Sequence, residues 1–242
     1  MGRHVYCARC VATHPICFSC GLPSLTHRTL PDGRVICGYC RRRAVTTDRE
    51  AAPHYERARR FLETWTAIEL KTVPKLKLVD MFEMSALAKA IRKTTDSVAL
   101  RGLYSRQTTT LLTPRGKTLP VSETETIYVA DHLYDEIFRV AAVHELMHDL
   151  IHERFSRLEK APLWVQEGIC QQASAELCRR RRYDDALAVI ESSRDPDYGD
   201  GYRYVRNLSG SEHWKNWNAL RKWMETIDVG LLPETAPHVG PA

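Results

Sequence analysis

The chain has 242 residues, of which 43% are hydrophobic, and a formal net charge of +5. This length suffices for one full core and a small additional module, and the sequence contains neither an 18-residue apolar run nor an N-terminal secretory pattern, which predicts a soluble, cytoplasmic protein. The positive charge gathers in "CRRRA" at 40–44 and "CRRRRYDD" at 178–185, a pattern more typical of solvated helix faces than of a nucleic-acid-binding or membrane surface.

Six of the eight cysteines precede residue 41 and form three Cys-x2-Cys pairs. In a chain without a secretory signal, such pairs favour zinc thiolates over disulfides. The second and third pairs have the spacing C-x2-C-x16-C-x2-C, which suits one tetrahedral zinc site: Cys17, Cys20, Cys37 and Cys40. Asp32-Gly33 between them predicts a hairpin turn. We therefore expect a small zinc-knuckle module, LIM-like or zinc-ribbon-like, at residues 1–45, folded around a structural zinc.

The first pair, Cys7 and Cys10, supplies only two ligands. A second structural zinc there requires further donors, for which His4, His14 and His27 are the candidates. The alternative is that the pair is half of a site whose other half is absent from this chain. The sequence leaves both possibilities open.

Residues 46–233 are predicted to form an α+β domain in which strands come first and helices follow. Periodicity and turn residues predict these elements in chain order: a helix at 54–70, a strand at 75–82, a helix at 85–93, strands at 97–104 and 107–112, a turn at 113–118 and a strand at 125–130. From residue 132 onward the pattern is helical. The Pro- and Gly-rich residues 234–242 are expected to be a loose tail.

The stretch "HELMH" places His144 and His148 four residues apart on a predicted helix at 135–155. Residues at i and i+4 share one helix face, so both imidazoles can bind one Zn²⁺, and Glu145 is close enough to take the proton of a water at that metal. His152 lies about 12 Å from His144 along the helix axis, too far to bind the same ion. The bland alternative is a pair of buried histidines bonded to backbone or carboxylate groups.

A third ligand is expected from a second helix, "APLWVQEGICQQASAEL", which a turn near 160–162 folds back against the first. Glu167 is the candidate. Gly168 permits close helix contact, and Gln171 is placed to orient a ligand. Cys170 and Cys178 are expected to be core cysteines. Two histidines and one glutamate leave a fourth position for water, as in catalytic zinc sites.

With "HELMH", "VQEGICQ" and "SSRDPDYGDGYR" at 192–203, the chain resembles the DA-one family of LIM peptidases, plant organ-size regulators that are ubiquitin-activated latent endopeptidases and that have bacterial relatives. "ICFSCGLPSLTHRTLPDGRVICGYC" and "RGLYSRQTTT" extend the resemblance over most of residues 7–233. It implies a minimal gluzincin metallopeptidase domain, with His144, His148 and Glu167 as zinc ligands and Glu145 as general base. Ubiquitin-linked regulation is implied by the resemblance only, and the ubiquitin-interacting helices of the plant proteins are missing.

The chain is therefore expected to be a zinc-dependent endopeptidase acting on protein or peptide substrates. Tyr198 is the first candidate to donate a hydrogen bond to the developing oxyanion, with Tyr202 and His213 behind it. Asp200 is expected either to orient a zinc histidine or to cap the following helix. An extended substrate is expected to add as a strand beside residues 126–130, at an exposed sheet edge.

Two rival hypotheses remain. In one, the chain is a zinc-knuckle adaptor that binds protein or nucleic acid and carries an inactive peptidase domain. In the other, the peptidase is latent because the cysteine module covers the cleft.

Overall fold

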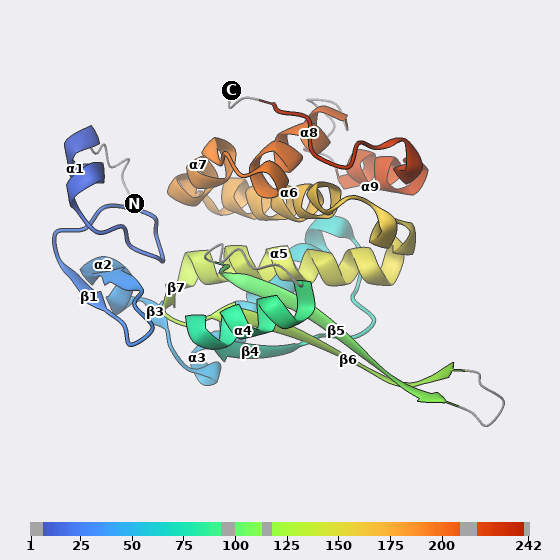
Figure 1. Cartoon of the computed structure of the whole chain (residues 1–242), viewed down its shortest axis with the longest axis horizontal. Helices are drawn as coiled ribbons and strands as arrows, with labels where there is room; N and C mark the ends of the chain where they lie inside the picture. The colour runs from blue at the N-terminus through green and yellow to red at the C-terminus, as the bar shows by residue number, and fades with distance from the viewer. Residues whose placement is uncertain (1–6, 93–99, 113–117, 209–216, 240–242) are drawn as a thin grey trace.

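The computed structural model describes residues 7–92, 100–112, 118–208 and 217–239. His4, His213 and most of the predicted turn at 113–118 lie outside these ranges. The described residues form a mixed α and β fold in which a three-stranded sheet, a long central helix and a group of C-terminal helices lie in successive layers (Figure 1). None of the described helices is long and apolar enough to cross a membrane.

The cysteine module contains helix α1 (Ala8–Thr13), strands β1 (His27–Thr29) and β2 (Val35–Cys37), and helix α2 (Gly38–Arg42). The two strands pair antiparallel, as the sequence predicts. Gly33 closes the turn at a φ of 86°, in the left-handed region that favours glycine. The turn returns the chain so that the third Cys-x2-Cys pair, Cys37 and Cys40, lies beside the second, Cys17 and Cys20.

Helix α3 (Asp48–Thr66) begins six residues earlier than the sequence pattern predicts and ends four residues earlier. Its first turn is polar and shows no apolar period, but Thr47 and Glu50 form a capping box that satisfies the free backbone N–H groups there. A positive φ at Ala67 ends the helix. Strand β3 (Ala44–Val45) precedes α3 and pairs with β7 (Leu133–Tyr134), just before the central helix.

The main sheet has the strand order β4-β6-β5, with β4 (Lys75–Val79) parallel to β6 (Thr118–Ala130) and β5 (Gly102–Leu112) antiparallel to it. Helix α4 (Met81–Arg92) follows β4. The two strands predicted at 97–104 and 107–112 are one strand from Gly102 onward, and residues 97–99 lie outside the described ranges. The prediction separated them because Ser105 and Arg106 interrupt the apolar pattern, yet both remain in the ladder with β6.

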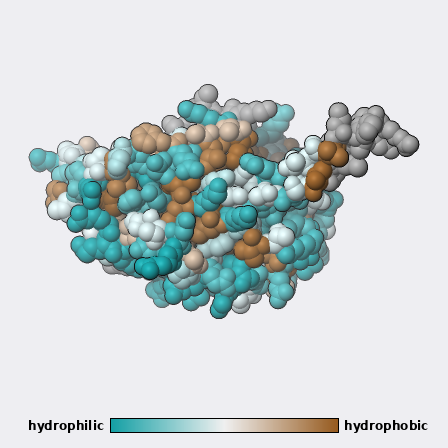
Figure 2. All heavy atoms as spheres, turned by 90° about the horizontal axis from the view of Figure 1, so that it is seen from below, coloured by the Kyte–Doolittle hydropathy of each residue, from teal (hydrophilic) through white to brown (hydrophobic). Residues whose placement is uncertain are grey.

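The expectation of an exposed edge at residues 126–130 is wrong. These residues pair with β4 on one side and with β5 on the other, so β6 is the central strand. The edge strand on the side of the central helix is β5. Beyond Gln107 the paired strands β5 and β6 leave the body as a projecting ribbon (Figures 1 and 2), and Leu111 and Val121 on it are exposed.

The central helix α5 (Asp135–Arg154) lies between the sheet and helix α6 (Leu163–Arg181), to which a 3-10 turn at Ser156–Lys160 connects it (Figure 1). Because both of its faces are covered, most of its side chains are buried, including charged ones. The remaining described elements pack on and around α6: α7 (Asp184–Ser192), a single π-helical turn (Pro196–Asp200), α8 (Gly201–Leu208), α9 (Trp217–Thr226) and a 3-10 turn (Val229–Leu231).

The cysteine module is joined to the rest of the chain by buried polar contacts. The Arg34 guanidinium pairs with Asp32 at 2.6 Å and also contacts Asp131, which lies between β6 and β7. The Ser19 hydroxyl accepts a hydrogen bond of 2.8 Å from the Tyr134 backbone N–H at the start of α5. The module is therefore fixed against the end of α5 that leads to the histidine motif.

Candidate metal centres and the pocket between them

Helix α5 presents His144 and His148 on one face, one turn apart, with ring centroids separated by 5.1 Å. Helix α6 returns beside α5 and brings Glu167 to the same point. The distance from Glu167 Oε2 is 2.8 Å to His144 Nε2 and 3.4 Å to His148 Nε2. The three residues that sequence reasoning selected as ligands therefore meet, although Glu167 lies 19 positions after His148 in the chain.

The electrostatics of this cluster reflect its burial, because Glu167 is 0% exposed. Burial by itself raises the pKa of a carboxyl group, but the adjacent imidazoles outweigh it and hold the pKa of Glu167 well below its ordinary value. For His148 burial lowers the pKa, and Cys170 and Glu167 reverse that effect and raise it well above the ordinary value. Negative charge at Glu167 and positive charge beside it are thus favoured together.

The donor set fits a zinc ion. Bonds of about 2.1 Å in a tetrahedral site place the donor atoms about 3.4 Å apart, close to the separations of the Glu167 oxygen from the two imidazole nitrogens. Among the described residues, the buried Nε2 of His148 has no hydrogen bond that satisfies it. A cation bound between the two helices would satisfy this atom.

Cys170 belongs to the same cluster, which sequence reasoning did not foresee. Its Sγ and one ring nitrogen from each of His144 and His148 all lie within 4.8 Å of one another. Its position three residues after Glu167, on the same face of α6, is the signal that would have identified it. Burial raises the pKa of Cys170 to about 11, and a protonated thiol is a poor metal ligand. The expectation that Cys178 is a core cysteine is met, since it is fully buried.

Glu145 lies beside the cluster of candidate ligands. It is 4% exposed and lines a pocket that adjoins the cluster. Its carboxylate packs against Gly102 at the start of β5: a Cβ at Gly102 would come within 2.5 Å of Glu145 Oε1. Only glycine leaves room for the carboxylate there. The edge strand of the sheet therefore passes directly alongside the candidate base.

Tyr198 stacks on His144, with ring centroids 5.7 Å apart and the ring planes inclined by 29°. It lies in the π-helical turn, whose N-terminus is capped by Asp195 through 2.9 Å hydrogen bonds from the backbone N–H groups of Asp197 and Tyr198. Gly199 in this turn packs so closely on the Ser193 carbonyl that a Cβ would collide with it. This tight turn brings Tyr198 to the same cavity as His144 and Glu145.

The structure differs from the sequence predictions for Tyr202, Asp200 and the C-terminal tail. Tyr202 is fully buried, and its hydroxyl accepts a 2.8 Å hydrogen bond from Arg179, so it does not reach the pocket and is wrong as a second oxyanion donor. Asp200 bonds Arg203 at 2.6 Å and His238 at 3.2 Å, rather than a metal histidine. The contact with Asp200 also holds residue 238 of the predicted tail against α8.

Gly168, Gln171 and His152 lie near the candidate ligands in the sequence. Gly168 permits the close approach of α6 to α8, because a Cβ there would lie 2.6 Å from the Gly201 carbonyl oxygen. Gln171 lines the pocket, but within the described residues it forms no hydrogen bond with a candidate ligand. His152 points away from the cluster and contacts Arg106 and Glu159.

The second donor set lies in the cysteine module. The sulfur atoms of the four cysteines predicted as zinc ligands lie within 4.8 Å of one another: Cys17, Cys20, Cys37 and Cys40. The sulfur atoms of Cys20 and Cys37 are 4.0 Å apart, close to the roughly 3.8 Å expected for thiolates on one tetrahedral zinc. Side-chain hydrogen bonds from Cys20 and Cys40, together with the backbone N–H of Cys37, lower the pKa of Cys17 and favour its thiolate. This group could hold a metal ion.

Cys7 and Cys10 form no such group. Their sulfur atoms are 3.2 Å apart at the start of α1, with Cys7 exposed. Within the described residues no third histidine, cysteine or carboxylate joins them, so neither His14 nor His27 completes the second structural zinc site.

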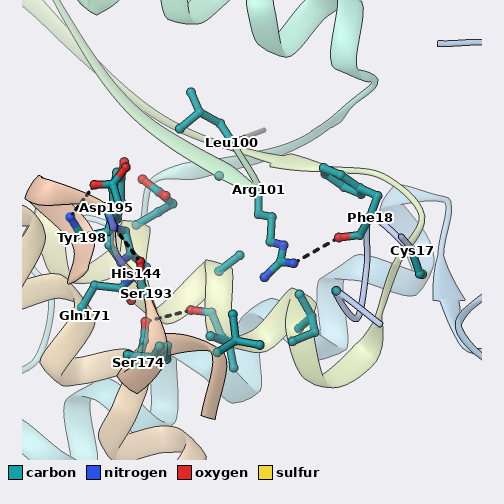
Figure 3. A pocket seen from close by; sticks show the side chains of 18 of the residues that line it. Cys17, Phe18, Leu100, Arg101, His144, Gln171, Ser174, Ser193, Asp195 and Tyr198 are labelled. Atoms are coloured by element: carbon teal, nitrogen blue, oxygen red, sulfur yellow. Dashed lines mark hydrogen bonds between the residues drawn. The ribbon is translucent and has the colours of Figure 1, made fainter. Parts of the chain in front are cut away.

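A cavity of about 430 Å³ separates the two donor sets (Figure 3). His144 and Tyr198 lie at one end, Cys17 and Phe18 lie at the other, and the Arg101 guanidinium lies between them (Figure 3). Glu145 also lines the cavity. The cysteine module thus supplies one wall of the cavity that adjoins the candidate metal centre of α5 and α6.

Comparisons of the chain with known protein families, curated proteins and solved structures find no match in any of the three. The resemblance to the DA-one family therefore stays a prediction that depends on the quoted motifs alone.

Proposed function

We propose that the chain is a zinc-dependent endopeptidase that hydrolyses protein substrates. The observation that carries this proposal is the convergence of two imidazoles and one buried carboxylate at the end of a cavity that also contains a glutamate and a tyrosine. A zinc ion held by His144, His148 and Glu167 would polarise a peptide carbonyl and lower the pKa of water toward about 7. The remaining chemistry belongs to the chain's own side chains.

Glu145 is the general base of the proposed reaction. Its carboxylate lies at the metal end of the cavity and is largely removed from bulk water, so it is positioned to accept the proton of the attacking water. The same carboxyl group then protonates the leaving amine. The backbone of Gly102 packs against the carboxylate and limits the positions open to it.

Tyr198 is proposed to stabilise the oxygen that gains negative charge when the carbonyl is attacked. Its ring is stacked on His144, at the mouth of the cluster rather than in the core. A phenolic O–H at this point donates a hydrogen bond without moving far, which is the condition for effective transition-state stabilisation.

The substrate is proposed to add as a strand beside β5 rather than β6. Strand β5 is at the edge of the sheet, and no described strand pairs with its outer side. Its first residue, Gly102, lines the cavity next to Glu145. Main-chain hydrogen bonds to this edge would hold an extended peptide of varied sequence, as an endopeptidase requires.

One observation favours a second candidate function. If the Cys170 thiolate joined the two histidines and Glu167, four protein ligands would close the site, and the chain would be an adaptor with two structural metals. A closed site leaves no position for water. The two functions differ in whether the chain catalyses metal-dependent cleavage, since the adaptor would catalyse none.

The test is cleavage of an unfolded protein, such as denatured casein, with and without a chelator. We expect Glu145→Gln to lose about 10²- to 10⁴-fold in kcat while keeping its metal, because only the proton acceptor is removed. Glu136→Gln on the same helix is the matched control and should keep its activity. Full activity of Glu145→Gln would disprove the mechanism, and absence of chelator-sensitive cleavage in the wild type would favour the adaptor.

A further inference from the structure

The cavity between the two donor sets is mostly apolar, apart from its metal end. Helix α5 contributes Ile137, Val140 and Ala141 to its walls, and Ile190 of α7 and Leu100 before β5 add to them. A cavity of about 430 Å³ with such walls can receive a side chain or a chain end of a bound peptide. Because it opens next to Glu145, the group that enters it would belong to a residue near the cleaved bond.

Arg101 places a positive charge in this cavity. It precedes Gly102 at the start of β5, and its guanidinium points into the open space between the metal end and the cysteine module (Figure 3). Its Nη2 donates a hydrogen bond of 3.1 Å to the Phe18 carbonyl oxygen. A guanidinium has five N–H donors, and this bond is the one that Arg101 forms within the described part of the chain, where most of its donors are therefore available.

No carboxylate among the described residues forms an ion pair with Arg101. Asp195 also lines the cavity, but it lies at the opposite end, where its Oδ1 accepts the hydrogen bonds that cap the π-helical turn. Burial lowers the pKa of Arg101, and the sulfur atoms of the cysteine site partly offset this effect. An anion in the cavity would pair with this positive charge and accept hydrogen bonds from its unused N–H donors.

We propose that Arg101 is a specificity-determining residue and that this cavity selects a substrate residue bearing a carboxylate. This inference is based on the proposed peptidase function and names the substrate class for the same site. The carboxylate has two possible sources, the side chain of an internal glutamate or the C-terminus of the substrate chain. Both fit an apolar-walled cavity into which a guanidinium points.

The experiment uses quenched fluorescent peptides in which a single glutamate is moved along an otherwise neutral sequence, each paired with the glutamine version. At one fixed position relative to the cleaved bond, the wild type should prefer glutamate by about 10-fold or more in kcat/KM. The same peptides with free and with amidated C-termini separate the two sources, because a chain-end carboxylate gives a preference only in the free-acid form.

Arg101→Gln should lose this preference while still cleaving the glutamine peptides, and Arg101→Lys should keep part of it. Arg60→Gln, which changes an exposed arginine on α3, is the matched control and should behave as the wild type. Equal kcat/KM of the wild type for all paired peptides, free and amidated, would overturn the proposal. That comparison needs no variant, so it decides the question even if Arg101→Gln fails to fold.

Peptide binding to Glu145→Gln, measured by fluorescence anisotropy, separates this proposal from the proposed function. A glutamate or free-acid preference in binding without any cleavage by the wild type would refute the peptidase and keep the carboxylate pocket. Cleavage without discrimination would refute the pocket alone. If Arg101→Gln loses zinc from the cysteine site while the wild type shows no preference, the arginine serves only as a counter-charge to the thiolates.

Discussion

The two donor sets of this chain differ in how they are built. The cysteine set comes from two short turns within 24 residues and consists of four sulfur atoms that face one another. The other set comes from two long buried helices and combines two imidazoles with a carboxylate, at the end of a cavity. Four thiolates close a metal site, whereas three ligands beside a cavity leave it open.

This difference indicates which set the fold depends on. The module around the cysteines has only two three-residue strands and two helices of six and five residues, and only a few of its side chains are buried. Helix α5 packs against α6 on one side and against the sheet on the other, so the two helices are expected to form with or without an ion. A metal ion is therefore expected to stabilise the fold of the cysteine module, whereas at the donor set of α5 and α6 it is expected to be needed for activity and not for folding.

The largest effect is expected from Cys17→Ser, which removes a fully buried ligand of the module. It should lose one metal per chain and about 4 kcal/mol or more of unfolding free energy, in the upper range for single substitutions. Metal analysis and thermal unfolding measure both. Cys7→Ser is the control and should change neither, because no third donor joins Cys7 among the described residues.

The same variant tests whether the peptidase is latent. Because the module forms one wall of the cavity, we expect Cys17→Ser to lower the activity toward peptides. A rise in activity would mean instead that the module blocks the site, as the latency hypothesis requires.

A smaller effect is expected from Tyr198→Phe. Removing one oxyanion donor should lower kcat about 10²-fold with little change in KM, because the lost hydrogen bond strengthens only in the transition state. Tyr204→Phe, whose ring packs on Trp164, is the control. An unchanged kcat would reduce Tyr198 to a packing residue on His144.

A pH-dependent effect concerns a second buried carboxyl on α5 and separates burial from metal binding. Asp149 is 0% exposed, and burial together with Glu125 and Glu153 raises its pKa to about 8. The folded state therefore binds a proton more tightly than the unfolded state, and this contribution to stability is present below about pH 4 and is lost as the pH rises toward 8. The Asp149→Asn variant has no carboxyl group to titrate at this position, so its stability does not show this loss as the pH rises.

Relative to the wild type, Asp149→Asn should gain stability with pH by at most about 1.4 kcal/mol per unit between pH 4 and 8. Urea unfolding at several pH values measures the gain. Asp184→Asn, at an exposed site at the start of α7, is the control. A stability difference that does not change with pH would show that Asp149 titrates normally.

Local patterns made much of this fold predictable. The i, i+4 spacing of His144 and His148 lies within one helix, and Glu167 lies on the next long helix along the chain. The cysteine spacing specifies a hairpin that brings four thiols together. Tyr198 was also predictable, because the glycine beside it indicates a tight turn. In each case the residues that decide the structure are close together in the sequence.

The remaining features depend on contacts between distant segments. The pairing of β6 with β4 on one side and β5 on the other cannot be read from its own residues, which is why the substrate edge was assigned to the wrong strand. The contact of Phe18 with Arg101 joins residues 83 positions apart. A distant partner also accounts for the burial of Tyr202, whose hydroxyl is bonded by Arg179.

The most direct test of two metal sites with different roles is elemental analysis of the wild type and His148→Ala, combined with chelator-sensitive cleavage of denatured casein. The proposed sites predict about two zinc ions per chain in the wild type, and a loss of one zinc together with the activity in the variant, which should keep its fold. Unchanged zinc in His148→Ala, or cleavage that is insensitive to the chelator, would contradict a catalytic metal between α5 and α6.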